Sequence, residues 1–145
     1  MSEPTIDPGQ PVPITVLLVE DNEQNAYLVR YLLEHQGWVV VHAWTGAQAL
    51  ELGPSRPFSL VVLDIQLPDL DGYQLARLLR GLPGLQSAPM VAVTSHALAG
   101  DRDRALAAGC DEYLEKPIEP LTFASTLLGV LDRSTGGAHG KHPGQ

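Results

Sequence analysis

Hydrophobic and polar residues form alternating blocks along the middle of the chain, and these blocks predict strands that take turns with helices. Short apolar runs bounded by polar residues are typical of buried strands. They occupy residues 15–19, 38–43, 59–63 and 90–93, and a shorter fifth run lies at 113–114. A helix-like segment follows each run. We therefore expect an α/β fold in which helices cover both faces of a parallel sheet.

The segments between the runs place apolar residues at helical spacing and stop at glycine or proline. We expect helices from after Asp21 to about Gln36, from about Ala47 to Leu52, from near Gly72, through Asp101–Arg104 to Gly109, and from Pro120 onward. In the third helix the predicted buried stripe consists of Leu75, Leu78, Leu79 and Leu82. In the fifth helix it consists of Leu121, Ala124, Leu128 and Leu131.

The two ends of the chain differ in composition from its middle. Residues 1–13 are rich in proline, and residues 133–145 are rich in glycine and carry His139, Lys141 and His142. We expect a disordered leader at 1–13, one folded domain at 14–132 and a disordered tail at 133–145. We assign no metal to the tail histidines.

Charge and cysteine content narrow the class of protein. Nine basic residues against seventeen acidic ones give a net charge of −8, which disfavours direct binding to nucleic acid or to an anionic membrane. The single cysteine, Cys110, excludes an intrachain disulfide and a zinc cluster of cysteines, and we interpret it as a packing residue. Because the sequence shows neither a secretory signal nor a membrane span, we expect a cytoplasmic protein.

The predicted strands end in residues that suit phosphoryl chemistry. Glu20 and Asp21 follow the first strand, Asp64 ends the third, Thr94 ends the fourth, and Lys116 follows the fifth. The carboxyl ends of adjacent parallel strands form one edge, where α/β proteins bind ligands. We therefore expect these side chains to converge on one pocket.

Clustered carboxylates repel each other unless a cation joins them, and Mg²⁺ suits oxygen ligands. Asp64 would then serve both as metal ligand and as nucleophile toward phosphorus. Lys116 would neutralise one oxygen of the transferred group, and Thr94 would donate its hydroxyl to another. Taken singly, each residue also has a structural explanation, since Asp and Asn cap helices and Thr is common in strands.

Four segments resemble the receiver domain of two-component response regulators across about residues 14–132. They are Leu17–Asn22, Val62–Pro68 with Asp71–Gly72, Val91–Thr94, and Tyr113–Ile118. The sequences of these segments are most similar to those of single-domain regulators of the DivK type and of receivers of hybrid histidine kinases. The resemblance implies a flavodoxin-like (βα)5 fold, CheY-like and doubly wound, whose five parallel strands are ordered 2-1-3-4-5.

The resemblance also implies roles for individual residues. Asp64 would accept the phosphoryl group from a phosphohistidine, and Lys116 would pair with that group. Asp21 would bind Mg²⁺ directly, Glu20 directly or through water, and Gln66 through its backbone carbonyl. The Lys116–Pro117 bond is expected to be cis.

A switch and a partner surface follow from the same resemblance. Thr94 would move toward the phosphoryl group while the ring of Tyr113 turns inward, although Tyr113 could also be an ordinary core residue. The fourth helix, fifth strand and fifth helix, including the polar Asp101–Arg104 run, form the expected surface for a downstream partner or a phosphorylation-dependent dimer. Gln66, Ser95 and His96 would set the lifetime of the phosphorylated state, with His96 also interpretable as a solvated loop residue.

Several readings stay open at this point. The first is a signalling switch that catalyses its own phosphorylation and dephosphorylation without being a turnover enzyme, with a histidine kinase or a histidine phosphotransfer protein as donor. The same receiver could be a fragment of a hybrid histidine kinase or of a longer regulator. An FMN-binding carrier on the same fold is disfavoured because Glu20–Glu23 would repel phosphate. A phosphatase is disfavoured because Gln66 stands where a general acid is needed.

Overall fold

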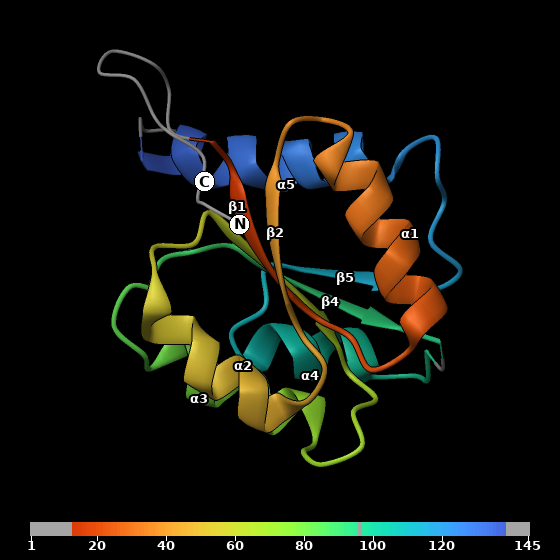
Figure 1. Cartoon of the computed structure of the whole chain (residues 1–145). Coiled ribbons are helices and arrows are strands. Elements are labelled where there is room, and N and C mark those ends of the chain that lie inside the picture. The colour runs from red at the N-terminus through yellow and green to blue at the C-terminus, as the bar shows by residue number, and fades with distance from the viewer. Residues whose placement is uncertain (1–12, 96, 139–145) are drawn as a thin grey trace.

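The computed structural model describes residues 13–95 and 97–138 as alternating strands and helices around one sheet (Figure 1). The five strands run parallel in the order β2-β1-β3-β4-β5, which confirms the predicted topology. In chain order the elements are β1 (Thr15–Val19), α1 (Glu23–Glu34), β2 (Val39–Ala43), α2 (Gly46–Leu52), a 3-10 turn (Gly53–Ser55), β3 (Leu60–Asp64), α3 (Gly72–Arg80), β4 (Met90–Thr94), α4 (Asp101–Ala107), β5 (Glu112–Glu115) and α5 (Phe123–Ala138).

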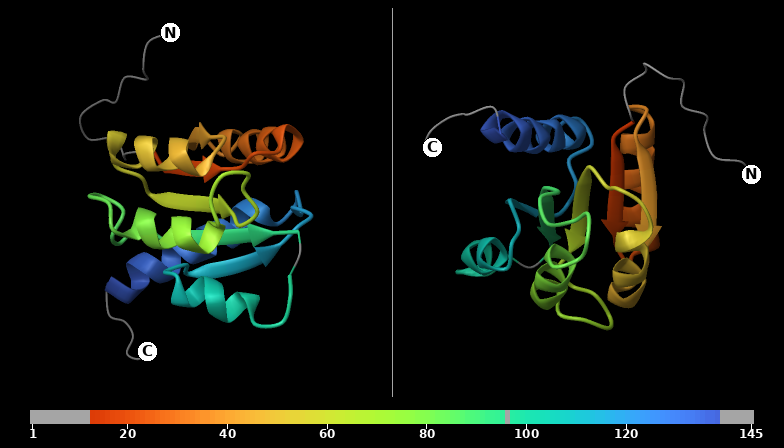
Figure 2. Two further views of the ribbon diagram at one scale, coloured as in Figure 1. Left: turned by 90° about the horizontal axis from the view of Figure 1, so that it is seen from below. Right: turned by 90° about the vertical axis from the view of Figure 1, so that its left-hand side faces the viewer.

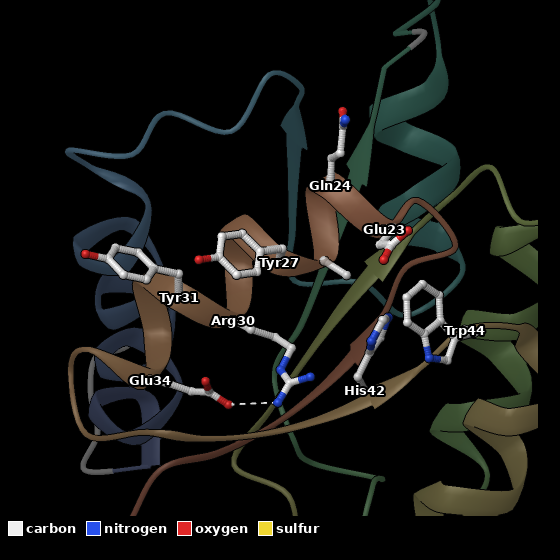
Figure 3. Close-up of a pocket in the computed structure, with 9 residues that line it drawn as sticks. Glu23, Gln24, Tyr27, Arg30, Tyr31, Glu34, His42 and Trp44 are labelled. Carbon is white, nitrogen blue, oxygen red and sulfur yellow. Dashed lines mark hydrogen bonds and ion pairs between the residues drawn. The ribbon is translucent and has the colours of Figure 1, made fainter.

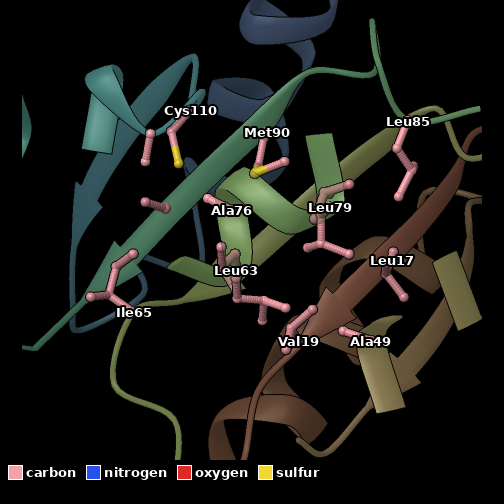
Figure 4. Close-up of a cluster of buried hydrophobic side chains, with 14 of the residues drawn as sticks. Leu17, Val19, Ala49, Leu63, Ile65, Ala76, Leu79, Leu85, Met90 and Cys110 are labelled. Carbon is pink, nitrogen blue, oxygen red and sulfur yellow. The ribbon is translucent and has the colours of Figure 1, made fainter. Parts of the chain in front are cut away.

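Helices cover both faces of the sheet, and each face has its own apolar core. Successive strand residues point to opposite faces, so Val16 and Leu18 pack toward α1 and α5, whereas Leu17 and Val19 pack toward α2, α3 and α4. The right-hand view of Figure 2 shows the sheet between α5 on one side and α2, α3 and α4 on the other. Figure 4 shows the core on the α2–α4 side, including Leu63, Leu79 and Met90.

The strands at the centre of the sheet are buried along their whole length, which explains their continuous apolar runs. Every residue of β3 and of β4 is buried. Their last residues are Asp64 and Thr94, so both polar side chains lie in a largely water-excluded setting at the carboxyl edge of the sheet. The alternation of strands and helices thus places the candidate site residues Asp64 and Thr94 where the fold largely excludes water from them.

Side-chain caps fix where the helices next to this edge begin. The side chain of Asn22 accepts from the Asn25 amide at 2.9 Å, and Thr45 accepts from the Gln48 amide at 3.1 Å. Such caps satisfy amides that the first helical turn leaves without partners. Asp69, in the loop after β3, accepts from the amides of Gly46 and Ala47 at 2.9 and 3.0 Å. The loop after β3 is therefore tied to the start of α2.

The predicted buried face of α5 was wrong in part: Ala124 and Leu131 are partly buried and pack against the core, but Leu121 and Leu128 do not belong to that face. Phe123, Leu127 and Val130 are buried, whereas Leu121 is 91% exposed and Leu128 is 39% exposed. Residues 120–122 form a turn in which the carbonyl of Glu119 accepts from the amides of Thr122 and Phe123. The helix consequently begins at Phe123 instead of Pro120, and Leu121 lies in the turn before it.

Three smaller expectations also need correction. Leu78 on α3 is 44% exposed, so only Leu75, Leu79 and the partly buried Leu82 form the predicted stripe. The α5 helix continues to Ala138, beyond the predicted domain end at 132. Asp101 is buried and is not part of a polar surface run.

The rest of the predicted leader and tail, residues 1–12 and 139–145 with both tail histidines, lies outside the described residues. Within the described part of the chain, no helix is long and apolar enough to cross a membrane.

Candidate functional site

Three carboxylates meet at the carboxyl edge of the sheet. One oxygen from each of Glu20, Asp21 and Asp64 lies within 4.8 Å of the others. Glu20 and Asp64 are buried, while Asp21 is exposed to solvent. The two acids after β1 and the acid at the end of β3 therefore converge as expected, because β1 and β3 are neighbours in the sheet.

Lys116 joins the two buried acids of this group. Its ammonium nitrogen Nζ lies 3.0 Å from Oε1 of Glu20 and 3.3 Å from Oδ2 of Asp64. The side chain is 10% exposed, so the charge is largely removed from water. The Lys116–Pro117 peptide bond is cis, as predicted. A cation held between two buried carboxylates offsets their mutual repulsion.

The environment of Asp64 makes its carboxyl a weaker acid than usual. Burial is the main cause, and the neighbouring charge of Glu20 adds to it; together they raise the pKa of Asp64 to about 6. Opposing this shift, Oδ1 of Asp64 accepts from the backbone amide of Gln66 at 2.9 Å, and Lys116 lies close by. At neutral pH the carboxylate is still mostly ionised, which a nucleophile requires.

The loop after β3 crosses back on itself close to Asp64. The amide of Gly72 donates to the carbonyl of Ile65 at 3.1 Å. A side chain at position 72 would place its first carbon 2.5 Å from the Cα and the carbonyl oxygen of Ile65. Only glycine allows this close approach of two backbone segments. Gly72 thus allows the backbone conformation of the segment that carries Gln66, two positions after Asp64.

Two loops meet beside Asp64 through a side-chain bridge. The side-chain carbonyl oxygen of Gln66 accepts from the hydroxyl of Ser95 at 2.8 Å and from its amide at 3.3 Å. Thr94 precedes Ser95 and is buried at the end of β4. The structure therefore brings Gln66, Thr94 and Ser95 together near the acids, whereas His96 lies outside the described residues.

Tyr113 on β5 points its hydroxyl into the protein. This oxygen is buried and has no hydrogen-bond partner among the described residues. Burial raises the pKa of Tyr113, and the nearby carboxylate of Asp101 adds to the shift. The same carboxylate affects Tyr73, whose pKa is raised to about 12, first by burial and then by Asp101. Two tyrosines from β5 and α3 therefore face one buried acid at the start of α4.

Sequence reasoning missed His42 and Asp69, and it assigned Asp101 to a polar surface although the side chain is buried. Nε2 of His42 lies 2.8 Å from the carbonyl oxygen of Glu20, and Asp69 binds the start of α2. Asp101 accepts from the Leu98 amide at 2.8 Å. His42 and Asp69 act on segments that only the fold brings near, and an isolated polar residue in an edge strand or loop gives no sequence signal.

The acidic group has the chemistry that a hard divalent cation requires. Carboxylate and backbone carbonyl oxygens are preferred ligands of Mg²⁺, which usually keeps several waters. One acid of the group is open to solvent and two are buried, so a cation could keep waters on one side and protein oxygens on the other. The donor set therefore fits Mg²⁺.

Comparison with known proteins decides the family. The model of the family described as response regulator receiver domain matches residues 16–127. The chain belongs to this family. It is a receiver domain of two-component signalling, with the CheY-like, flavodoxin-like fold that the resemblance implied, and the FMN-binding alternative is not supported.

Two curated relatives differ greatly in length. The chain is 42% identical over 115 residues to the signal transduction histidine-protein kinase BarA of Escherichia coli, covering 79% of this chain but 12% of that kinase. It is 36% identical over 120 residues to the polar-differentiation response regulator DivK of Brucella anthropi, covering 83% of this chain and 98% of that regulator. Receivers of both kinds, attached to a kinase or alone, are thus similar to this one.

Solved structures agree with the fold. A CheY-like receiver domain protein from Methanospirillum hungatei superposes with a TM-score of 0.81 at 26% identity, covering 87% of this chain and 99% of that one. The receiver domain of a sensor histidine kinase from Pseudomonas aeruginosa superposes with a TM-score of 0.73 at 33% identity, covering 86% of this chain and 99% of that one. That second structure has a magnesium ion coordinated in its active site cleft.

Proposed function

We propose that this receiver accepts a phosphoryl group on Asp64 from a phosphohistidine and signals through protein contacts. A carboxylate oxygen of Asp64 attacks phosphorus, an O–P bond forms, and the P–N bond to the donor imidazole breaks. The bonding pair goes to the imidazole nitrogen, and the product is an aspartyl phosphate. The convergence of Asp64 with Lys116 and two further acids at the carboxyl edge of the sheet carries this proposal.

The surrounding residues would neutralise charge on the transferred group. We propose that Asp21, Asp64, the backbone carbonyl of Gln66 and Glu20, directly or through water, hold Mg²⁺, which supplies positive charge to the phosphoryl oxygens. Lys116, already beside Asp64, would turn its ammonium from the two carboxylates to a phosphoryl oxygen. Thr94, next to β3 in the sheet, would donate its hydroxyl to another oxygen.

The same geometry supports a switch that involves Thr94 and Tyr113. Movement of Thr94 toward the phosphoryl group would empty space near the fourth and fifth strands, and the ring of Tyr113 would fill it. The buried hydroxyl of Tyr113 in this structure supports an inward-facing ring as one position of the switch. Asp101 and Tyr73, which face that hydroxyl, would transmit the change to α4.

The signal would leave through the face formed by α4, β5 and α5. On this face Glu112 pairs with Arg102 at 2.9 Å and with Arg133 at 3.3 Å. These pairs link all three elements, so a shift of α4 would change the whole face. A downstream protein, or a second copy of the phosphorylated chain, is the proposed partner there, in the cytoplasm and without contact to nucleic acid or membrane.

Transfer from a phosphohistidine tests this function directly. A histidine phosphotransfer domain carrying radioactive phosphate, mixed with the receiver and Mg²⁺, should lose its label to the wild type. Asp64→Asn, which keeps the size of the side chain, should leave the label on the donor. Label that moves equally to both proteins would contradict Asp64 as acceptor.

A further inference from the structure

His42 reaches the turn that carries two of the three acids. It belongs to β2, the edge strand of the sheet, where it pairs with Leu18 in the register of β1. Its Nε2 lies 2.8 Å from the backbone carbonyl oxygen of Glu20. A carbonyl oxygen can only accept, so Nε2 carries the proton and the imidazole is the donor.

With this contact, every polar group of Glu20 has a hydrogen-bond or ion-pair partner. The amide of Glu20 donates to the carbonyl of Ala43 at 3.0 Å. Its side chain binds Lys116 through Oε1 at 3.0 Å, and Oε2 accepts from the Asn22 amide at 3.1 Å. The carbonyl is the remaining polar group of the residue, and His42 holds it.

The carbonyl of Glu20 belongs to the peptide plane that joins Glu20 to Asp21. Because that unit is rigid and planar, fixing the direction of the C=O also fixes the amide and the Cα of Asp21. Among the described residues, no hydrogen bond or ion pair orients the exposed carboxylate of Asp21 instead. The orientation of its backbone therefore decides how this side chain approaches the other acids.

The imidazole of His42 is itself held in a groove between α1 and the sheet edge. Its ring centroid lies 4.1 Å from that of Trp44, with the planes tilted by 45°. Figure 3 shows the two rings side by side below α1, with the guanidinium of Arg30 nearby and paired with Glu34. Side chains locked by their neighbours make better positioning groups than free ones.

We infer that His42 is a positioning residue for the metal-binding turn, through its hydrogen bond to the carbonyl of Glu20. The inference rests on the proposed Mg²⁺ site. Loss of the donor would free the Glu20–Asp21 peptide plane, so the Mg²⁺ ligands would be less well ordered before binding. Groups that orient metal ligands typically change metal affinity by about 10-fold or more when removed.

The test compares two substitutions at position 42. His42→Gln keeps an N–H donor at about the same reach, whereas His42→Phe keeps a ring without a donor. Tyr27→Phe changes the same groove without touching Glu20 and serves as the matched control. Isothermal titration with Mg²⁺ gives the dissociation constant, and thermal unfolding in EDTA gives the stability of the metal-free protein.

We expect His42→Phe to weaken Mg²⁺ binding about 10-fold, and His42→Gln and Tyr27→Phe to stay within about twofold of the wild type. The melting temperature in EDTA should change little. Equal Mg²⁺ affinities for the wild type and His42→Phe would overturn the inference, as would equal weakening in His42→Phe and His42→Gln.

The test also covers a His42→Phe variant that does not fold and a wild type that does not bind Mg²⁺. If His42→Phe does not fold, His42→Asn replaces it, because its amide is too short to reach the carbonyl, and the same Mg²⁺ comparison with His42→Gln applies. A wild type that binds no Mg²⁺ would overturn both the proposed metal site and this inference. Normal wild-type binding without an effect at position 42 would overturn the inference alone.

Discussion

The side-chain carbonyl of Gln66 and the hydroxyl of Ser95 lie 2.8 Å apart and join the loops that follow β3 and β4. Both residues are exposed, and both are within two positions of a buried site residue, Asp64 or Thr94. The bridge therefore stands at the solvent side of the acidic group. We therefore predict that these two side chains hinder a water that attacks an aspartyl phosphate from this side.

We predict that Ser95→Ala shortens the half-life of the phosphorylated protein about fivefold, because one hydrogen bond contributes on the order of 1 kcal/mol and only the longer bond from the backbone amide at position 95 then holds Gln66. The measurement is the loss of the phosphoryl adduct over time after removal of the donor. An unchanged half-life would show that the bridge does not limit hydrolysis.

The same measurement on His96→Ala tests whether His96 affects the lifetime of the phosphorylated state. An unchanged rate of dephosphorylation in this variant would show that His96 has no such role.

Gly72→Ala should destabilise the domain, because its new methyl group would meet the backbone of Ile65 at 2.5 Å. Overpacking of this kind costs about 2 kcal/mol of unfolding free energy. Gly81→Ala is the matched control, since Gly81 has an ordinary helical φ of −84° and its nearest neighbour would be 3.6 Å away. Urea unfolding of both variants tests this. A Gly72→Ala protein as stable as the control would mean that the loop after β3 adjusts without cost.

Tyr113→Phe should leave the unfolding free energy unchanged or raise it by up to about 1 kcal/mol. A buried hydroxyl without a partner costs free energy, and its removal deletes that cost. Tyr27→Phe, on a side chain that is 72% exposed, serves as control. Chemical denaturation of the unphosphorylated proteins provides the comparison. A loss of more than about 1 kcal/mol in Tyr113→Phe would mean that the hydroxyl makes a favourable bond.

Cys110 should be an unreactive thiol in the folded protein. Burial raises its pKa to about 11, and the charge of Asp111 adds to this. The unfolded chain therefore releases the thiol proton first, so between about pH 9 and 11 this group makes stability fall as pH rises. Alkylation by iodoacetamide should increase up to pH 10 in the native protein but level off near pH 9 in urea. Native labelling that levels off near pH 9 would contradict the shifted pKa.

The sequence was a good guide to features that depend on one segment alone. The apolar runs of β3 and β4 are continuous because both strands are buried on both faces, so Asp64 and Thr94 could be located at their ends. Parallel pairing of neighbouring strands then brings the acids together. The local pattern, together with the strand order that the family resemblance implied, was sufficient for this part of the site.

Features that depend on contacts between distant segments could not be predicted. Part of the α5 face was misplaced, because Leu121 lies in a turn before the helix and nothing in the apolar spacing reveals that turn. His42 contacts a residue 22 positions away, and Asp69 contacts one 23 positions away. Asp101 looked like a surface charge in a polar run, but it is buried where α4 begins.

The central claim is that Asp64 accepts a phosphoryl group in a Mg²⁺-dependent reaction. Intact-protein mass spectrometry after incubation with acetyl phosphate, with Mg²⁺ or with EDTA, tests it on the wild type and on Asp64→Asn. We predict one phosphoryl adduct in the wild type with Mg²⁺, and none with EDTA or in the variant. An adduct of equal yield in folded Asp64→Asn, or none in the folded wild type with Mg²⁺, would contradict the account.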